Sequence, residues 1–520
     1  MSWLTNFRSK HGLNNLSLAS PLLGIHVPDL SFLVFYLSPL LFAIVCFIIM
    51  NLVATSACGV VFLAGRAQAL TSFQPTCTLP NTTVHFVASA GIRGTFDILW
   101  SCIFTIIACT WSIQHLNVPE QRDRSKETSE RWGAGFWYDT VWSLKRTWTG
   151  FKWMMVTILA PEFILGKAIG DLITARNLTK DLQHRAKEEG VEWDLVHSFF
   201  LLMGGFRLES SDKEIPDLPS LTHRRDVNPS PNLTRAWPSH RDPAILVLTP
   251  RSFKSLLSES VITQLPKISG DEIRDKSKSN LFVKVVAVVQ VIWVTIQVIA
   301  RTIRGLSVSQ LELVVTAFSA CAVLTYILLI PKPQGVEIPA PSILVPVSQW
   351  NAVKIRYDAL VNLNLRVAFF PGLDGRKNTT LGRTKLANDA ICVLGYRENL
   401  RYAVGISASG VLFGAIHVAG WNFDFPTSID RMLWRVSSVL IVVLLPPSLL
   451  PFAWHALSSS FDLYNVTDKR EFIAQAVALL CGIAYVLARL VILVETFRSL
   501  AYMLREAYLS TWAENVPHFG

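Results

Sequence analysis

The sequence is poor in charge. Asp, Glu, Lys and Arg make up only 17% of its 520 residues, and 51% of the residues are hydrophobic; soluble globular domains carry about 25% charged residues. The apolar residues gather in long runs, which excludes a disordered or purely soluble chain. On a soluble protein a net charge of +10 would point to nucleic acid. In a chain with long apolar runs it is typical of cytosolic loops and lipid headgroups, and since no nucleic-acid-binding motif is found, we expect no nucleic-acid partner.

Several catalytic and metal-binding motifs are absent. The eight cysteines have no CxxC or Cys/His spacing of a zinc site. There are no HxxxH boxes of a di-iron enzyme and no DDxxD pair of a magnesium-dependent prenyl transferase. A Walker A loop, a Rossmann fingerprint and a GxSxG elbow are also missing. We therefore expect no metal and no cofactor, and the absence of an internal repeat weakens the case for an inverted-repeat transporter.

What the chain does contain is a series of apolar segments. A membrane-spanning helix needs about 20 predominantly apolar residues. Seven segments meet this requirement: residues 32–52, 96–113, 282–300, 311–330, 403–420, 433–454 and 472–494. The sequence predicts an all-α fold, a polytopic membrane helix bundle of about seven or eight transmembrane helices with one or two interfacial or re-entrant helices.

Residues 153–173 form a marginal segment, because they include Pro161, Glu162, Lys167 and Asp171. If this segment crosses the membrane, the basic loops 119–152 and 351–401 lie on opposite sides, against the positive-inside tendency. If it does not cross, both loops lie in the cytosol. The sequence leaves this choice open.

The expected organisation has four parts. They are a cytosolic N-terminal head (1–30), an N-terminal membrane region (31–206) with a basic loop (117–152), a polar Pro-rich loop (207–280) and a C-terminal membrane region (281–520). At the end of the polar loop, residues 265–280 are predicted to form a short capped helix that leads into the next span.

The second apolar span carries a polar stripe. Arg93, Asp97, Ser101 and Thr105 recur every four residues, so on one continuous helix they share a face. Arg93 and Asp97 could then pair directly. The stripe is either a helix–helix seam closed by this pair or the polar wall of a substrate cavity.

Two further ionisable residues stand inside apolar segments. Glu162 follows Pro161, which interrupts a helix, and it is either a buried acid or an interfacial charge partnered by Lys167. His417 lies in an apolar span before an aromatic turn, and it is either a proton carrier or a structural hydrogen-bonding group.

These observations define an expected site. Its catalytic residues are Asp97, Glu162 and His417, and its substrate-binding residues are Arg93, Ser101, Thr105, His115, Trp421, Asn422 and Asp424.

Several strings of residues, taken together, resemble a known family. They are Arg93-Gly94-Thr95 to His115-Leu116-Asn117-Val118-Pro119, Ala160-Pro161-Glu162, Met203-Gly204-Gly205-Phe206, Asp275-Lys276-Ser277-Lys278, and His417 to Trp434-Arg435. On these motifs the chain resembles a large family of uncharacterised fungal multi-pass integral membrane proteins. The resemblance implies a filamentous-fungal membrane protein and names no reaction.

Two classes of function fit these residues. The first is a membrane-embedded enzyme that acts on a lipid or isoprenoid by acid–base chemistry, such as a cationic cyclisation or isomerisation. The second is a transporter, channel or receptor-like protein that uses the same polar groups as a solute or proton path. The expected partners are membrane lipids and a lipid or isoprenoid substrate, in the endoplasmic reticulum or another endomembrane, with the plasma membrane as the alternative. The oligomeric state is left open.

Overall fold

The described part of the protein covers most of the apolar segments. The computed structural model describes residues 93–121, 134–211, 245–278, 281–346, 348–350, 352–353, 386, 388, 396–448, 468–509 and 511. The predicted N-terminal head and the first predicted span, 32–52, lie outside these residues.

Five helices are long and apolar enough to cross a membrane. They are α3 (Thr95–Ser112), α9 (Leu281–Ile303), α10 (Gln310–Leu329), α12 (Tyr396–Val418, continued by the 3-10 turn Ala419–Asn422) and α15 (Asp468–Ser499, continued by Leu500–Tyr502). They make the chain a mostly helical membrane protein. α13 (Ser428–Ser448) runs beside α12 and α15 but is not one of these five. The expected count of seven or eight spans therefore stays a prediction.

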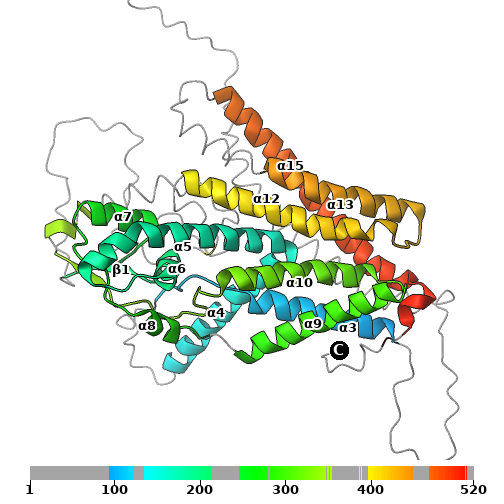
Figure 1. Ribbon diagram of the computed structural model, residues 1–520, viewed down its shortest axis with the longest axis horizontal. Coiled ribbons are helices and arrows are strands. Elements are labelled where there is room, and N and C mark those ends of the chain that lie inside the picture. Colours follow the sequence, from blue (N-terminus) through cyan, green and yellow to red (C-terminus); the bar gives the residue numbers. More distant parts are fainter. Residues whose placement is uncertain are drawn as a thin grey trace, which may run out of the picture.

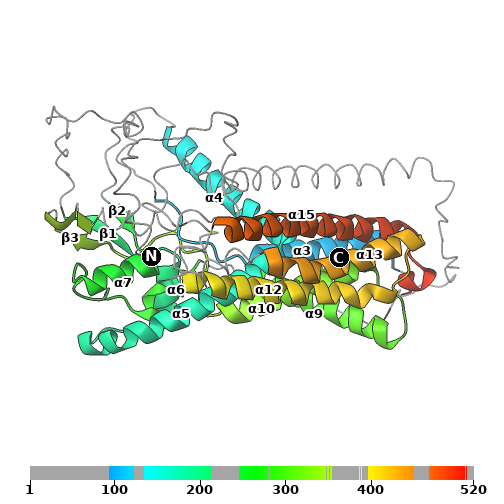
Figure 2. The ribbon, with the colours of Figure 1, turned by 90° about the horizontal axis from the view of Figure 1, so that it is seen from above.

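The long helices lie along the long axis of the molecule (Figures 1 and 2). At one end the chain forms a small sheet, and we call this the sheet end. At the other end α3 begins, α9 ends and residues 505–509 and 511 lie against the bundle, so we call this the strap end and these residues the strap. α9 and α12 start at the sheet end, whereas α3 and α10 start at the strap end (Figure 1).

The sheet end holds three short strands. β1 (Arg207–Ser210) lies between β2 (Ile245–Val247), to which it is antiparallel, and β3 (Ile343–Val345), to which it is parallel. α6 (Leu195–Leu202), α7 (Pro250–Ser258) and α8 (Gly270–Asp275) lie around this sheet (Figure 1). α8 is the capped helix predicted at the end of the polar loop, with Ser269 as its N-cap.

The sheet corrects the all-α prediction. Strands of three or four residues are too short to show the alternating pattern that predicts a strand. Their positions are fixed by tertiary packing, because Leu208, Leu246 and Val345 are buried in one core with Phe206 and Phe253. Segments on both sides of the expected boundary at residue 206 contribute to this core.

The marginal segment is broken in two. α4 (Ala134–Leu159) ends at Ala160, whose backbone is not helical (φ −145°, ψ 69°), and α5 (Pro161–Glu189) starts with Pro161 at its first position. Proline suits this position because the first helical N–H has no partner within the helix. From Pro161, α5 packs against α12 so closely that a Cβ at Gly166 would collide with the Ile406 backbone.

Both halves return to the sheet end. Arg146 of α4 pairs with Glu337, which lies between α10 and β3 (2.6 Å), and the second half of α5 buries Leu178 and Leu182 in the core of the small sheet. α4 and α5 thus form a re-entrant hairpin with its tip inside the bundle. The first half of α4 and the end of α5 therefore lie at the same end of the bundle.

A labelling experiment tests this arrangement. We expect cysteines introduced at Thr140, near the start of α4, and at Lys187, near the end of α5, to react with an impermeant maleimide from the same side of sealed membranes. Both positions are exposed. Of the described native cysteines, those at 102, 109 and 321 are buried and Cys481 is partly buried, so the labelling of the chain without introduced cysteines is subtracted. Labelling from opposite sides would mean that the segment crosses the membrane.

Candidate functional site

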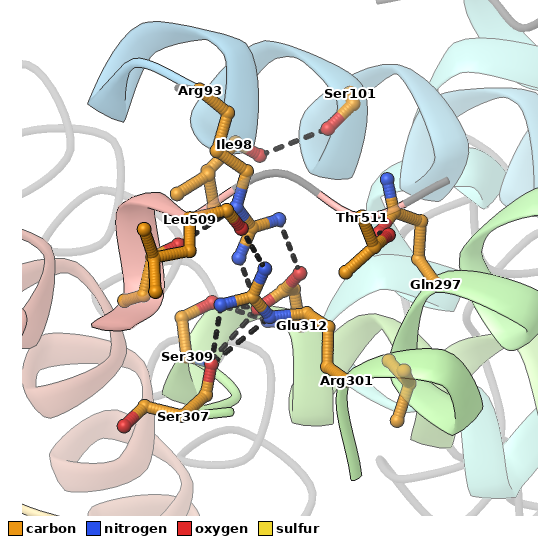
Figure 3. A network of polar contacts seen from close by, with 12 residues as sticks. Arg93, Ile98, Ser101, Gln297, Arg301, Ser307, Ser309, Glu312, Leu509 and Thr511 are labelled. Carbon is orange, nitrogen blue, oxygen red and sulfur yellow. Dashed lines mark hydrogen bonds and ion pairs between the residues drawn. The ribbon is translucent and has the colours of Figure 1, made fainter. Parts of the chain in front are cut away.

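The strap end contains a buried ion pair. Arg93 donates to Glu312 through both terminal nitrogens (Nη1–Oε1 2.7 Å, Nη2–Oε2 3.3 Å), and both side chains are at least nine-tenths buried (Figure 3). Glu312 also accepts from the backbone N–H and the hydroxyl of Ser309, the N-cap of α10. This geometry fixes the start of α3 against the start of α10.

The predicted pair of Arg93 with Asp97 is wrong. α3 begins at Thr95, so Arg93 lies before the helix and the four-residue spacing does not bring the two side chains together. Asp97 instead accepts from the backbone N–H of Gly94 (2.8 Å) and is exposed. Its role here is to cap its own helix.

A second arginine at this end holds the strap. Arg301 donates to the carbonyl oxygens of Ser307, Glu506 and Leu509, and Arg93 Nε donates to that of Ala507 (2.8 Å). We call Arg93, Arg301, Ser309, Glu312 and the strap the end network (Figure 3). Its donors bind backbone carbonyls and one paired carboxylate, so its geometry is that of a structural clamp.

The other polar residues of α3 contact their own helix. The hydroxyl of Ser101 donates to the carbonyl of Ile98 and that of Thr105 to the carbonyl of Ser101 (2.7 Å), and both side chains are buried. Since α3 packs against α9 and α10, these residues lie in a helix–helix seam.

The aromatic turn after α12 also lies at the strap end. Trp421 is 39% exposed and has the Arg435 guanidinium 5.0 Å from its ring. Asn422 and Asp424 are exposed, and the backbone carbonyl of Asp424 accepts from the Gln310 side chain (2.7 Å). These residues lie apart from the middle of the bundle.

The middle of the bundle holds a different polar group of residues. Glu162, at the tip of the re-entrant hairpin, is 1% exposed and accepts a hydrogen bond from the Tyr485 hydroxyl of α15. Arg489, one turn later in α15, donates to the carbonyl of Leu159, the last residue of α4 (3.1 Å). Arg489 is the midpoint of the apolar stretch Ala476–Tyr502, so the hairpin tip lies deep in the bundle.

His417 reaches the same region from α12. Its Nδ1 lies 2.8 Å from the Phe413 carbonyl, and because a carbonyl only accepts, Nδ1 carries the proton. The Arg489 guanidinium lies 4.3 Å from the Phe413 ring, and that ring lies 4.6 Å from the ring of His417. Cys321 and Tyr485 are buried in the same core cluster as Phe413. We call these six residues the central cluster: Glu162, Cys321, Phe413, His417, Tyr485 and Arg489.

Two buried atoms of the central cluster lack a partner. Among the described residues, neither Glu162 Oε2 nor His417 Nε2 has a hydrogen-bond partner. Leaving a buried polar atom unsatisfied costs about 1–3 kcal/mol. The atoms are a carboxylate oxygen and, in the neutral ring, an imidazole lone pair, so both are suited to binding or transferring a proton.

A row of aromatic rings leads away from His417. The ring of Phe413 lies 5.6 Å from Phe318 and 4.6 Å from His417, and His417 lies 6.0 Å from Trp434. Phe425, in the turn, is 5.6 Å from Trp434. Aromatic faces attract cations, so these rings, of which Phe413 and Trp434 are fully buried, can stabilise a positive charge next to them.

Two of the ten predicted site residues, Glu162 and His417, lie in the middle of the bundle, where both are near residues that Arg489 contacts. Of the others, His115 lies beyond the end of α3 at the sheet end, and the rest line the seam of α3 or lie at the strap end. Tyr485 and Arg489 were not among the predicted site residues. The sequence contains a signal for Tyr485 and Arg489, because they are polar residues four positions apart inside an apolar run. Only the fold shows that this pair lies beside Glu162.

Within the described residues, no three His, Cys, Asp or Glu side chains are grouped so that they could hold a metal ion.

Comparison with known proteins gives one match. The model of a family of unknown function matches residues 68–225 and 239–355, which is more than half of the chain. No curated protein and no solved structure matches.

Proposed function

The chain belongs to this family of unknown function (DUF8562), and we propose that it is a membrane-embedded enzyme that acts on a lipid or isoprenoid substrate by proton transfer in the central cluster. The observation that carries the proposal is the pair of unpartnered buried atoms, Glu162 Oε2 and His417 Nε2, on two side chains of that cluster.

Each residue has a role in this proposal. Glu162, in its protonated form, donates a proton to a carbon–carbon double bond of the substrate, and the π electrons form the new C–H bond. The cation left behind is stabilised by Phe413 and Trp434. His417 Nε2 then removes a proton from a neighbouring carbon, which re-forms a double bond. The proton returns to Glu162 through water, so the net change is an isomerisation or cyclisation with no change in oxidation state.

Tyr485 and Arg489 position the acid. Tyr485 donates to one oxygen of Glu162 and leaves the other free for the substrate. Arg489 binds the freed carbonyl at the end of α4 and thereby holds the tip of the hairpin in place. On sequence grounds, including a cytosolic head before the first span, we propose that the enzyme resides in the endoplasmic reticulum or another endomembrane.

The test is a comparison of lipid extracts. The chain is expressed in a host fed with lipid and isoprenoid precursors, and extracts are compared by mass spectrometry with those of the empty host. We expect a new product with the same elemental composition as a fed or endogenous lipid. Extracts that match those of the empty host under all feeding conditions would contradict the proposal.

Transport is the second candidate, and one observation favours it. The break between α4 and α5 places the ends of two half-helices deep in the bundle, which is how many transporters build their substrate sites. If the chain is a transporter, reconstituted liposomes will take up a solute or protons and the lipid composition will stay unchanged. Loss of that uptake in Glu162→Gln would then assign the central cluster to a transport path.

A further inference from the structure

The first half of α4 carries an exposed apolar stripe. Four apolar side chains on this part of the helix are between 38% and 68% exposed: Val141, Leu144, Trp148 and Phe151. At 3.6 residues per turn these positions fall within an arc of about 80°. The rings of Trp148 and Phe151 stack on one another, with 5.4 Å between their centroids. We call these four residues the α4 stripe.

The polar side chains of the same segment lie roughly opposite the stripe. Asp139, Ser143 and Arg146 are exposed, and Arg146 pairs with Glu337 (2.6 Å). Gly150 lies on the same side, so close to α3 that a Cβ there would contact the Trp111 ring at 3.4 Å. The bundle is therefore on the polar side of α4, and the α4 stripe points away from it.

A lysine lies along one edge of the α4 stripe. Lys145 follows Leu144 and lies about 40° from Val141 around the helix. Its ammonium is 4.8 Å from the Trp142 ring centroid and 4.0 Å from the carboxylate of Glu120, and both partners of this ion pair are exposed. An exposed ion pair contributes little to stability, so Lys145 can exchange Glu120 for another anion.

A lipid leaflet fits this arrangement. The chain has five helices that are long and apolar enough to cross a membrane, and α4 slants away from the long helices in both views (Figures 1 and 2). A helix with Trp, Phe and Leu on one face and basic residues beside them is typical of segments that lie between the headgroups and the acyl chains. Trp favours this level of the membrane, and anionic headgroups attract lysine there.

We propose that the α4 stripe inserts into the boundary between the headgroups and the acyl chains of an anionic leaflet, with the Lys145 ammonium against the lipid phosphates. The lipid surface would then anchor the outer end of the re-entrant hairpin, whose tip carries Glu162. This proposal does not depend on the reaction proposed for the central cluster, so either can fail while the other stands.

The experiment measures how deeply α4 lies in the bilayer. A fluorescent probe is attached to a cysteine in Leu144→Cys, in the full chain in nanodiscs of phosphatidylcholine and phosphatidylserine. One quencher is a lipid with a nitroxide near the top of its acyl chain, and the other is iodide in the buffer. Ser143→Cys, on the polar side, is the matched control, and the signal of the labelled chain without an introduced cysteine is subtracted. We expect the nitroxide to quench the probe at 144 several-fold more strongly than the probe at 143, and iodide to show the reverse order.

The same assay tests the role of charge. Lys145→Gln, or nanodiscs of phosphatidylcholine alone, should weaken the nitroxide quenching at position 144, because each lysine near an anionic surface adds to the attraction. Lys187→Gln, at an exposed position of α5, is the matched control and should leave the quenching unchanged.

Each outcome decides the proposal. A probe at 144 that is shielded from both quenchers would mean that protein covers the α4 stripe, and equal quenching at 143 and 144 would mean that both faces share one environment. Either result overturns the proposal. Nitroxide quenching that is unaffected by Lys145→Gln and by the loss of phosphatidylserine would overturn the assignment to an anionic leaflet.

Discussion

Replacing Glu162 with Gln is expected to reduce formation of the new lipid product by about 100-fold or more, because general acid–base catalysis contributes about 10²- to 10⁴-fold. Glutamine has nearly the same shape and retains an oxygen that can accept from Tyr485. It cannot supply the proton that the proposed first step requires. The measurement is the product per amount of purified chain, from extracts of cells expressing each variant.

Glu188→Gln is the matched control for this experiment. Glu188 is on the same helix, α5, but it is 63% exposed and lies at the sheet end. The same Glu-to-Gln change there should leave product formation within about twofold of the wild type, because surface substitutions away from a site have small effects. If Glu162→Gln forms product at the rate of Glu188→Gln, Glu162 is not the acid.

Replacing Glu312 with Gln is expected to lower the free energy of unfolding by about 3–5 kcal/mol, since it leaves the buried Arg93 guanidinium without its carboxylate. The pair is at least nine-tenths buried and joins α3 to α10. The measurement is denaturant unfolding of the purified chain in mixed micelles.

Two comparisons separate this effect from a general loss of stability. The double variant Arg93→Met with Glu312→Gln should be more stable than Glu312→Gln alone, because it removes the uncompensated charge. Asp181→Asn breaks the exposed ion pair with Lys254 and should cost less than about 1 kcal/mol. Equal losses in Glu312→Gln and Asp181→Asn would mean that the end network adds no special stability.

Apolar runs and a single proline in the sequence predicted several helices of this fold and one break between helices. Five of the apolar runs form α3, α9, α10, α12 and α15. The interruption at Pro161 was also visible, because proline removes a backbone donor. The sequence could not decide whether the chain crosses or returns at this point, since that depends on the packing of α5 against α12 and α10.

The candidate site is formed by residues that lie far apart in the sequence, so local patterns could not predict it. Glu162 and its partner Tyr485 are 323 positions apart, and Arg93 and Glu312 are 219 apart. Spacing along one helix favoured Asp97 as the partner of Arg93. That prediction was wrong because the helix starts two residues after Arg93. The sequence did identify Glu162 and His417, because ionisable residues are rare inside apolar segments and are often functional there.

The central claim is that Glu162 transfers a proton to the substrate. The most direct test is to incubate the purified chain in nanodiscs, with the lipid fraction that contains the substrate, in deuterium oxide. We predict that the product gains deuterium at carbon with the wild type and with Glu188→Gln, and that this gain is lost with Glu162→Gln. A product that forms without deuterium, or that gains it equally with Glu162→Gln, would contradict the account.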